Sequence, residues 1–384
     1  MFLETLTERN RELITFAEGL HKSGKVQPDS YILDIDTILY NAALIKEEAD
    51  RYGIELFFML KQIGRNPYIA KRLIELGYKG AVAVDFREAQ IMLEHKIPIC
   101  HAGHLVQVPR MLLKEFLEYG IEYMTVYSLE KAREIDEILR GTGKKQKILL
   151  KFVDEACMIY PSQESGFKIT EIENVVKELS ELNSVEIAGV TAFPAFLYRE
   201  ESKSIEVLHN CDVLEEAAGY LEEHLKRRME RNLPSCSQKS LMKTIKERKG
   251  TQAEPGNALA GTTPNNFDGS AQEIPAILYL TEISHNYEGK SYCYGGGLYS
   301  RGKAKKALVC GKDRQELVEV NMPCSENIDY YFSLEYEGSV SDTVIMCFRT
   351  QIFDTRSQVI LVEGLREHAP RVIGRYDSQG RFLG

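Results

Sequence analysis

The first two thirds of the chain alternate short apolar runs with amphipathic stretches, and this alternation constrains the fold more than any other feature. The apolar runs predict strands at Glu55–Leu60, Gly80–Asp85, Ile97–His101, Glu122–Tyr127, Lys147–Val153 and Val185–Thr191, with weaker candidates at Asn232–Cys236 and Gly250–Glu254. The stretches between them keep one face apolar, as crossover helices do. Eight such units would close an α/β barrel of the (β/α)8 TIM type, and an open doubly wound sheet is the alternative.

After Pro275 the pattern becomes one of strands and turns. Strands are predicted at Ile277–Ile283, Ala307–Cys310, Tyr330–Glu335, Val344–Thr350 and Gln358–Glu363. We therefore expect two domains, a barrel over residues 1–274 and a C-terminal β-domain over residues 275–384. The strand at residues 30–36 precedes the barrel proper and is expected to pair with the β-domain.

Three individual helices are also predicted. The first opens the chain at Leu3–His21, the second covers Thr37–Tyr52 with Asp36 as its N-cap, and the third runs from Ile205 to Met229.

Composition excludes several classes of protein. The 384 residues include 48 basic and 57 acidic ones, so the formal charge of −9 lacks the basic footprint of a nucleic-acid binder. The hydrophobic share of 43% is enough for a large core. Eight scattered cysteines without a CxxC pair argue against a zinc ribbon. No apolar run reaches the ~18 residues of a membrane span, and acidic residues near the N-terminus argue against a signal peptide. A soluble, cytoplasmic protein is expected.

Lys61 stands at the end of the first predicted barrel strand. In a barrel of this type the active site lies at the carboxyl ends of the strands. A lysine there most often keeps its charge in solvent while its stem packs on the protein. In a desolvated barrel mouth, burial instead disfavours the charged form and leaves the amine able to attack an aldehyde. Lys61 alone does not decide between these interpretations.

Three other segments are candidates for ligand binding, each with an ordinary structural alternative. The run Ala253–Gly261 places proline and glycine after a predicted strand, where backbone N–H groups can face a phosphate or simply form a turn. Hydroxyls in Pro234–Ser237 suit a phosphate site or a helix cap. The run Tyr292–Gly297 joins aromatic residues to three glycines, which indicates either a flexible hairpin or a close approach of the backbone to a ligand.

Together these segments resemble the fold-type III pyridoxal-phosphate (PLP) enzymes of the alanine racemase group, and most of all the YhfX-like proteins. The resemblance covers nearly the whole chain. It is carried by Ser30–Asp36 with Ile38 and Asn41, by Lys61 with Gln62–Pro67, by His101–Gln107, by Glu254–Gly256 with Gly261–Pro264, and by Tyr294–Gly295.

The resemblance implies PLP as the cofactor and assigns roles to three residues. Lys61 matches the Schiff-base lysine, which also moves the proton on the substrate Cα. Glu254 matches the residue that faces the pyridine nitrogen, which is arginine in alanine racemases, whereas ornithine and diaminopimelate decarboxylases have Glu-Pro-Gly as here. A carboxylate there favours a protonated ring. Tyr294 matches the second base, which each racemase subunit contributes to the active site of its partner. A homodimer with shared active sites is therefore expected.

The resemblance also implies which residues bind the phosphate. Ser235, Ser237, Gly256 and Asn257 are the predicted ligands, and Ser240 is the alternative in the same serine-rich turn.

The chain departs from the racemase pattern at several positions. Ala192 stands where alanine racemases have a histidine near the cofactor, followed here by Phe193. The racemase arginine of a Gly-x-Gly-Arg loop is missing, and Gln163 is the predicted neutral substitute for binding substrate. Lys151 resembles a lysine that some racemases carbamylate, with a packed or paired lysine as the alternative. These departures affect the choice of substrate more than that of cofactor.

Four further side chains have two interpretations each. His101 and His104 are spaced like metal ligands, but no third ligand is evident, so no metal is predicted and hydrogen-bonded scaffold is favoured. Near PLP, His101 is a candidate for contact with the ring face or O3′. Arg349 would bind a substrate carboxylate or form a salt bridge. Cys347 matches a catalytic cysteine of the decarboxylases, although a packed thiol is favoured.

The leading hypothesis is a PLP-dependent amino-acid racemase or epimerase that uses Lys61 and Tyr294 on opposite faces of the substrate. The alternatives are a PLP-dependent amino-acid decarboxylase, suggested by Glu254-Pro255-Gly256, and a non-catalytic PLP-binding protein. An amino-acid substrate is expected, without nucleic-acid or membrane partners. The sequence does not identify the side chain of that substrate.

Overall fold

The computed structural model of the chain describes residues 2–299, 301–324 and 326–384. These residues form two compact units. One unit contains the residues up to Leu44, Leu60–Ile69 and Gly256–Gly384, and the other contains Ile45–Met59 and Ala70–Pro255. Among the described residues, no helix combines the length and the apolar character that crossing a membrane requires.

The second unit contains a closed barrel of eight parallel strands, and the barrel prediction is confirmed. Around the barrel the order is β12-β13-β2-β3-β4-β5-β6-β9. The strands are β2 (Glu55–Phe58), β3 (Gly80–Val82), β4 (Ile99–Ala102), β5 (Tyr123–Val126), β6 (Gln146–Leu150), β9 (Val185–Thr191), β12 (Glu230–Asn232) and β13 (Gln252–Ala253). Because β12 and β13 pair and close the circle, the alternative of an open sheet is excluded.

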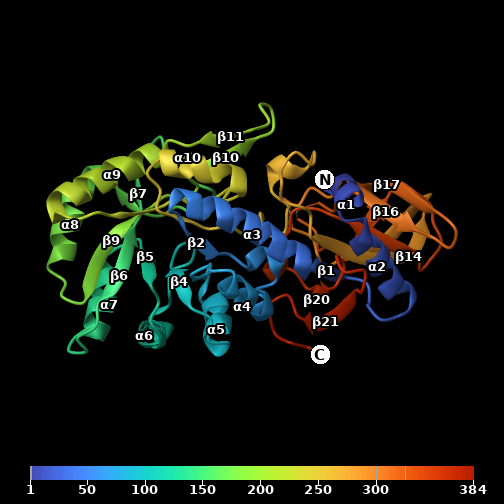
Figure 1. Cartoon of the computed structure of the whole chain (residues 1–384), viewed down its shortest axis with the longest axis horizontal. Helices are drawn as coiled ribbons and strands as arrows, with labels where there is room; N and C mark the ends of the chain where they lie inside the picture. The colour runs from blue at the N-terminus through green and yellow to red at the C-terminus, as the bar shows by residue number, and fades with distance from the viewer. Residues whose placement is uncertain (1, 300, 325) are drawn as a thin grey trace. The chain divides into compact units, whose positions relative to one another are not determined.

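One helix precedes the first barrel strand, and the others connect the barrel strands on the outside (Figure 1). Side-chain caps mark where some of them begin, since Asp85 accepts a hydrogen bond from the backbone of Glu88, and Ser128 accepts one from Lys131. The helices are α3 (Ile35–Tyr52), α4 (Pro67–Glu75), α5 (Phe86–Glu94), α6 (Arg110–Tyr119), α7 (Leu129–Leu139), α8 (Ile172–Ser180), α9 (Asn210–Leu225) and α10 (Met242–Glu247). The barrel interior is packed, with Phe57, Val82 and Leu149 in one buried cluster.

Shorter elements occur in both units. The parallel pair β7 (Phe152–Val153) and β8 (Phe167–Lys168) follows β6, and the hairpin β10 (Phe196–Arg199) and β11 (Ser204–Val207) follows β9. The short 3-10 helices are η1 (Lys61–Ile63), η2 (Ile169–Glu171), η3 (Lys239–Leu241), η4 (Pro264–Asn266) and η5 (Ile352–Asp354).

The first unit is built on a nine-stranded sheet, in the order β15-β18-β17-β16-β19-β14-β1-β20-β21. Its strands are β1 (Ser30–Asp34), β14 (Ile277–Tyr287), β15 (Lys290–Tyr294), β16 (Lys306–Cys310), β17 (Gln315–Asn321), β18 (Tyr331–Leu334), β19 (Thr343–Met346), β20 (Gln358–Glu363) and β21 (Arg371–Tyr376). The early strand β1 lies inside this sheet, antiparallel to β14 and parallel to β20. The predicted boundary at residues 274 and 275 stays a prediction.

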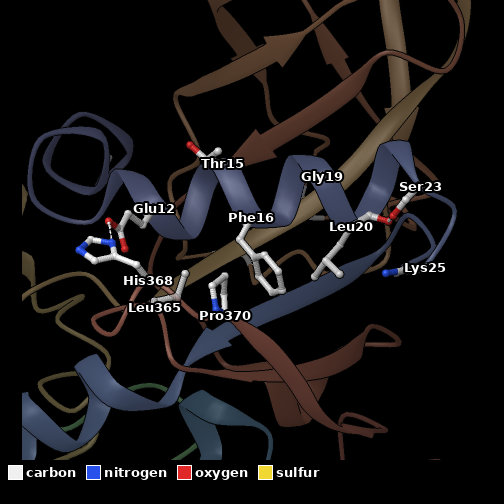
Figure 2. A pocket seen from close by; sticks show the side chains of 10 residues that line it. All are labelled: Glu12, Thr15, Phe16, Gly19, Leu20, Ser23, Lys25, Leu365, His368 and Pro370. Carbon is white, nitrogen blue, oxygen red and sulfur yellow. Dashed lines mark hydrogen bonds and ion pairs between the residues drawn. The ribbon is translucent and has the colours of Figure 1, made fainter.

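The opening helices cover this sheet. They are α1 (Leu3–Arg9) and α2 (Arg11–Lys22), and their apolar faces join Ile32, Leu278 and Ile345 in one core cluster. A hollow in the same unit lies beside α2 (Figure 2). It is lined by Phe16, Leu20, Leu365 and Pro370, and an ion pair between Glu12 and His368 lies at its edge.

The structure corrects several details of the sequence prediction. The opening helix is two helices, which meet at Asn10. The helix expected from Ile205 begins only at Asn210, because Ser204–Val207 forms β11. The N-terminus of α3 is capped by Asp34 rather than Asp36, since the Asp34 carboxylate accepts hydrogen bonds from both the N–H and the hydroxyl of Thr37.

Candidate active site

The barrel fold brings polar residues, some of them predicted as site residues, to the carboxyl ends of its strands. His101 lies on β4, Asn232 ends β12, and Glu254 directly follows β13. The strand β13 pairs with β2, and beyond both strands the N–H of Met59 donates to the carbonyl of Pro255 at 2.9 Å. Lys61 follows β2 after Met59 and Leu60, where it opens η1 as a half-buried residue. Lys61 and Glu254 thus follow neighbouring parallel strands.

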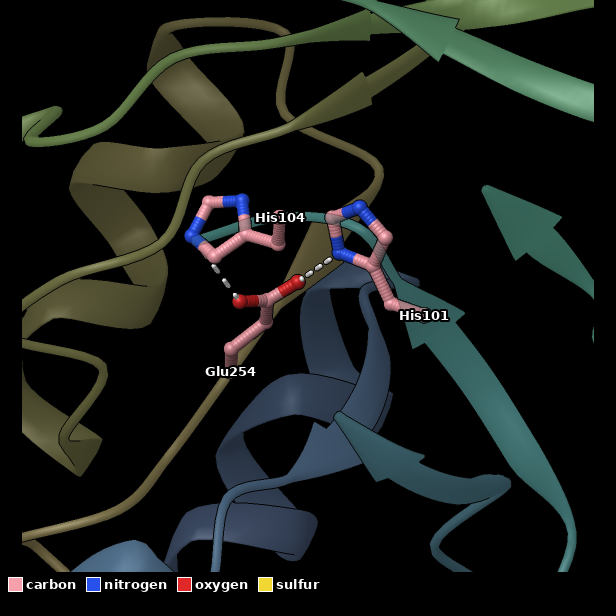
Figure 3. Close-up of side chains that lie close together, drawn as sticks. All are labelled: His101, His104 and Glu254. Carbon is pink, nitrogen blue, oxygen red and sulfur yellow. Dashed lines mark hydrogen bonds and ion pairs between the residues drawn. The ribbon is translucent and has the colours of Figure 1, made fainter. Parts of the chain in front are cut away.

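Glu254 is the central charge of this arrangement (Figure 3). Its carboxylate is buried, and its Oε1 atom accepts hydrogen bonds from His101 Nδ1 at 2.6 Å and from Asn232 Nδ2 at 2.9 Å. The other oxygen, Oε2, is also buried, yet among the described residues it has no hydrogen-bond partner. The Nε2 atom of His104 lies 3.9 Å from Oε2.

The surroundings of Glu254 favour its anionic form. Burial alone would raise the pKa of this carboxyl, but attraction to the imidazoles of His104 and His101 and hydrogen bonds from His101 and Asn232 lower the pKa to about 2. The net effect is a carboxylate that stays charged across the physiological pH range in a place without solvent.

The same three residues could in principle ligate a metal. His101, His104 and Glu254 offer ligand atoms within 4.8 Å of one another, so Glu254 is the third ligand that the sequence did not reveal. However, two ligands on a tetrahedral zinc with bonds of ~2.0–2.1 Å lie about 3.3 Å apart. The 2.6 Å between His101 Nδ1 and Glu254 Oε1 is a direct hydrogen bond instead.

The loop after β12 has an unusual backbone. Ser235 and Cys236 have consecutive positive φ angles of 85° and 47°, which is a costly conformation for non-glycine residues. Successive N–H groups in such a turn can converge on a phosphate. The Ser237 hydroxyl accepts a hydrogen bond from the backbone N–H of Glu254 at 3.1 Å, which joins this loop to the end of β13.

The hydroxyls of Ser235 and Ser240 already have protein partners. Ser235 Oγ accepts hydrogen bonds from the backbone N–H groups of Ala195 and Phe196 and donates to the carbonyl of Phe196. Ser240 Oγ accepts a hydrogen bond from Gln238. The side chain of Ser235 therefore shapes the loop, and its backbone N–H is the group that remains suited to a phosphate.

Gly256 and Asn257 lie in the first unit, beside the residue that follows Lys61. A Cβ atom at Gly256 would come within 2.7 Å of the Gln62 side chain, so only glycine fits without a shift there. Gln62 is itself held in place, because its carbonyl accepts a hydrogen bond from Thr350 at 2.7 Å. The Oδ1 atom of Asn257 is a buried acceptor without a hydrogen-bond partner among the described residues, and a phosphate oxygen would bind this amide through its Nδ2 donor.

Tyr294 ends β15 in the first unit, and 37% of its surface is exposed. Its carbonyl accepts hydrogen bonds from the hydroxyls of Thr281 at 2.8 Å and Tyr279 at 3.3 Å, and its ring packs against Tyr331. The backbone is therefore anchored while the phenol is presented at the surface.

The two predicted substrate-binding side chains lie in different units. Gln163 belongs to the barrel unit and Arg349 to the sheet unit. Gln163 Oε1 and Arg349 Nε are buried atoms for which the described residues offer no hydrogen-bond partner. Both atoms therefore have binding capacity left over.

The remaining candidates are packed side chains. Lys151 Nζ donates to Ser165 at 3.0 Å, and burial lowers the pKa of its ammonium. Burial raises the pKa of the Cys347 thiol to about 12, and its Sγ donates to the carbonyl of Ile277, as expected for a packed thiol. Phe193, which follows Ala192, meets the ring of His104 edge-on at 5.2 Å.

Asn232 and Thr125 are the site residues that the sequence analysis missed. Asn232 binds Glu254, and Thr125 Oγ1 lies 2.7 Å from His101 Nε2. For Thr125 the available signal was a polar residue near the carboxyl end of an otherwise apolar strand, which is the position that matters in such a barrel. Asn232 gave no such signal, because β12 reads Glu-Arg-Asn.

A closed eight-stranded parallel barrel together with a β-sheet unit defines an alanine racemase-like fold. The family description "Alanine racemase, N-terminal domain" matches residues 33–264, and "YhfX-like, C-terminal domain" matches residues 278–372. The chain belongs to this family of fold-type III enzymes, with a C-terminal domain of the YhfX-like kind. It is 42% identical over 386 residues to the protein YhfX of Escherichia coli (strain K12), and the match covers 100% of both chains.

Solved structures with the same fold have diverse activities. D-threonine aldolase from Filomicrobium marinum matches with a TM-score of 0.68 and 14% identity, over 93% of this chain and 96% of that one. Diaminopimelate decarboxylase from M. jannaschii, in complex with L-lysine, matches with a TM-score of 0.67 and 16% identity, over 95% of this chain and 93% of that one. Alanine racemase from Clostridium difficile 630, in complex with cycloserine, matches with a TM-score of 0.64 and 16% identity, over 91% of this chain and 98% of that one. At these identities the likeness concerns the fold alone.

Proposed function

We propose that this protein is a PLP-dependent racemase or epimerase of an amino acid. The observation that carries the proposal is Glu254, a buried carboxylate at the mouth of the barrel with one oxygen left without a hydrogen bond. A protonated pyridine nitrogen is a cationic N–H donor, and Oε2 of Glu254 is the acceptor that it requires. The residues present therefore fit the cofactor.

Further residues support the same cofactor. The backbone of Ser235 and Cys236, the Ser237 hydroxyl, Gly256 and Asn257 would hold its phosphate, and Lys61 would hold its aldehyde end through Nζ. When bound, PLP supplies an electron sink for negative charge at the substrate Cα. An anionic Glu254 keeps the ring protonated and so deepens that sink.

The proposed two-base racemisation needs one group that donates and accepts a proton on each face of the substrate. Lys61 Nζ would move the proton on one face. The phenol of Tyr294, presented at the surface of its own unit, would move the proton on the other face in a partner subunit's site. Arg349 and Gln163 would bind the substrate through the polar atoms that have no partner among the described residues.

A visible absorbance spectrum of the protein with PLP, before and after borohydride reduction, tests this proposal. The Lys61→Ala variant should lose the band of covalently held cofactor and should not become labelled on reduction. The control Lys71→Ala, an exposed lysine on α4, should behave as the parent does. An unchanged spectrum in the Lys61 variant would reject its assignment.

The alternative of an α-decarboxylase is favoured by one observation, the Glu254-Pro255-Gly256 motif after β13. Incubation with single enantiomers of amino acids separates the two reactions, because loss of chirality without CO2 supports a racemase, whereas amine and CO2 support a decarboxylase. A non-catalytic PLP-binding protein would hold the cofactor and give neither product.

A further inference from the structure

A belt of hydrogen bonds crosses the interior of the barrel. It links five buried side chains, each from a different strand or its end: Thr125 on β5, His101 on β4, Glu254 after β13, Asn232 on β12 and Thr191 on β9. The links are Thr125 Oγ1 to His101 Nε2 at 2.7 Å, His101 Nδ1 to Glu254 Oε1 at 2.6 Å, Asn232 Nδ2 to Glu254 Oε1 at 2.9 Å, and Thr191 Oγ1 to Asn232 Oδ1 at 2.8 Å.

This belt acts on only one oxygen of Glu254. An ionised carboxylate is an acceptor only, so His101 and Asn232 are the donors, and together they occupy the two lone-pair directions of Oε1. Turning the carboxylate would break two charge-assisted hydrogen bonds at once. Oε2 therefore keeps a fixed direction although no hydrogen bond within the described residues holds it.

We propose that His101 and Asn232 are positioning residues, which hold Glu254 so that Oε2 alone meets the ring nitrogen of the cofactor. This inference rests on the proposed function and deepens it. Both ring nitrogens of His101 are engaged, one with Glu254 and one with Thr125, so His101 has no nitrogen left for a hydrogen bond to the cofactor and acts on the ring nitrogen through Glu254. A carboxylate that is already oriented can bind the ring nitrogen without the free-energy cost of reorienting during binding.

The test compares two substitutions of His101 in the full-length protein. His101→Leu removes both hydrogen bonds of the imidazole, whereas His101→Asn keeps an amide donor near the former Nδ1. The PLP dissociation constant should rise about 10-fold to 100-fold in His101→Leu, as for loss of a hydrogen bond to a charged group, and by less than about 3-fold in His101→Asn. A loosely held Glu254 stabilises the protonated ring nitrogen less. The pKa of this nitrogen, followed by the absorbance of the bound cofactor, should therefore fall in the leucine variant.

The chain offers a matched control in its other unit. His21 is also buried, with Nδ1 2.8 Å from Thr343 Oγ1 and Nε2 2.8 Å from Glu282 Oε2, so it forms a second threonine–histidine–glutamate chain. His21→Leu should cost stability like His101→Leu, as measured by thermal unfolding, but leave the affinity and the spectrum of bound PLP unchanged.

Three results would overturn the proposal. One is an unchanged PLP affinity and spectrum in folded His101→Leu, and another is an equal loss in His21→Leu, which would make the effect unspecific. The third is stoichiometric zinc in the purified protein that depends on His101, His104 and Glu254, because the cluster would then be a metal centre. A parent protein that takes up no PLP would instead reject the proposed function and this inference together.

Discussion

At the scale of single residues, Asp29 is a carboxyl of the sheet unit whose ionised form is disfavoured by burial. Its Oδ1 atom accepts hydrogen bonds from the hydroxyls of Ser357 and Tyr279. Burial raises its pKa to about 6, against the lowering effect of these hydrogen bonds and of Arg356. Between about pH 4 and pH 6 the folded protein thus keeps a proton on Asp29 that the unfolded chain releases.

The raised pKa of Asp29 determines how the free energy of unfolding changes with pH. Because the native state binds the extra proton, the contribution of Asp29 to the free energy of unfolding is fully present below about pH 4 and is lost as the pH rises through 6. The loss amounts to about 3 kcal/mol. Asp29→Asn removes the titration but retains an acceptor oxygen, so urea unfolding at several pH values should show a shallower decline between pH 4 and 7. Exposed Asp313→Asn is the control, and parallel pH profiles for all three proteins would contradict the prediction.

At the scale of elements, the three glycines after β15 form a tightly enclosed loop. A Cβ atom at Gly295 would lie 2.0 Å from the carbonyl oxygen of Asp329, and one at Gly296 would lie 2.1 Å from a carboxylate oxygen of Asp29. The N–H of Gly296 donates to the Asp329 carboxylate at 3.1 Å. Close approach, and not a flexible hairpin, is therefore the reason for the glycines, and it fixes the chain next to Tyr294.

Gly296→Ala should consequently be costly. The new methyl group meets a carboxylate, and the φ angle of +125° is strained for any residue with a side chain. We expect the free energy of unfolding to fall by roughly 2–4 kcal/mol. Gly289→Ala, at a φ angle of +76° with open space around it, should cost about 1–2 kcal/mol for the backbone conformation alone. Equal losses in the two variants, measured by urea unfolding, would show that the close approach has no energetic effect.

At the scale of the whole molecule, the sequence predicted what depends on local periodicity and missed what depends on neighbours. The alternation of apolar runs indicated the barrel, and the motifs around Lys61 and Glu254 indicated the candidate site. The strands β15, β17 and β21 went unpredicted as separate elements, and β17 and β21 carry mostly exposed or half-buried side chains with a weak apolar signal. The roles of Asn232 and Thr125 follow from which strands adjoin in the closed barrel, and no local pattern contains that information.

The proposed sharing of sites between two subunits makes a prediction for mixtures of inactive variants. If each site of a homodimer uses Lys61 of one subunit and Tyr294 of the other, Lys61→Ala and Tyr294→Phe should each disable every site of their own homodimer. In a heterodimer, one site receives both substitutions, and the other receives an intact Lys61 from one subunit and an intact Tyr294 from the other. Random reassociation makes half of the dimers mixed, and one of the two sites in each mixed dimer is intact. Activity towards the amino acid identified by incubation with single enantiomers should therefore return to about one quarter of the parent level. If Tyr294 served the site of its own subunit, mixing would restore nothing, and the same assay would show it.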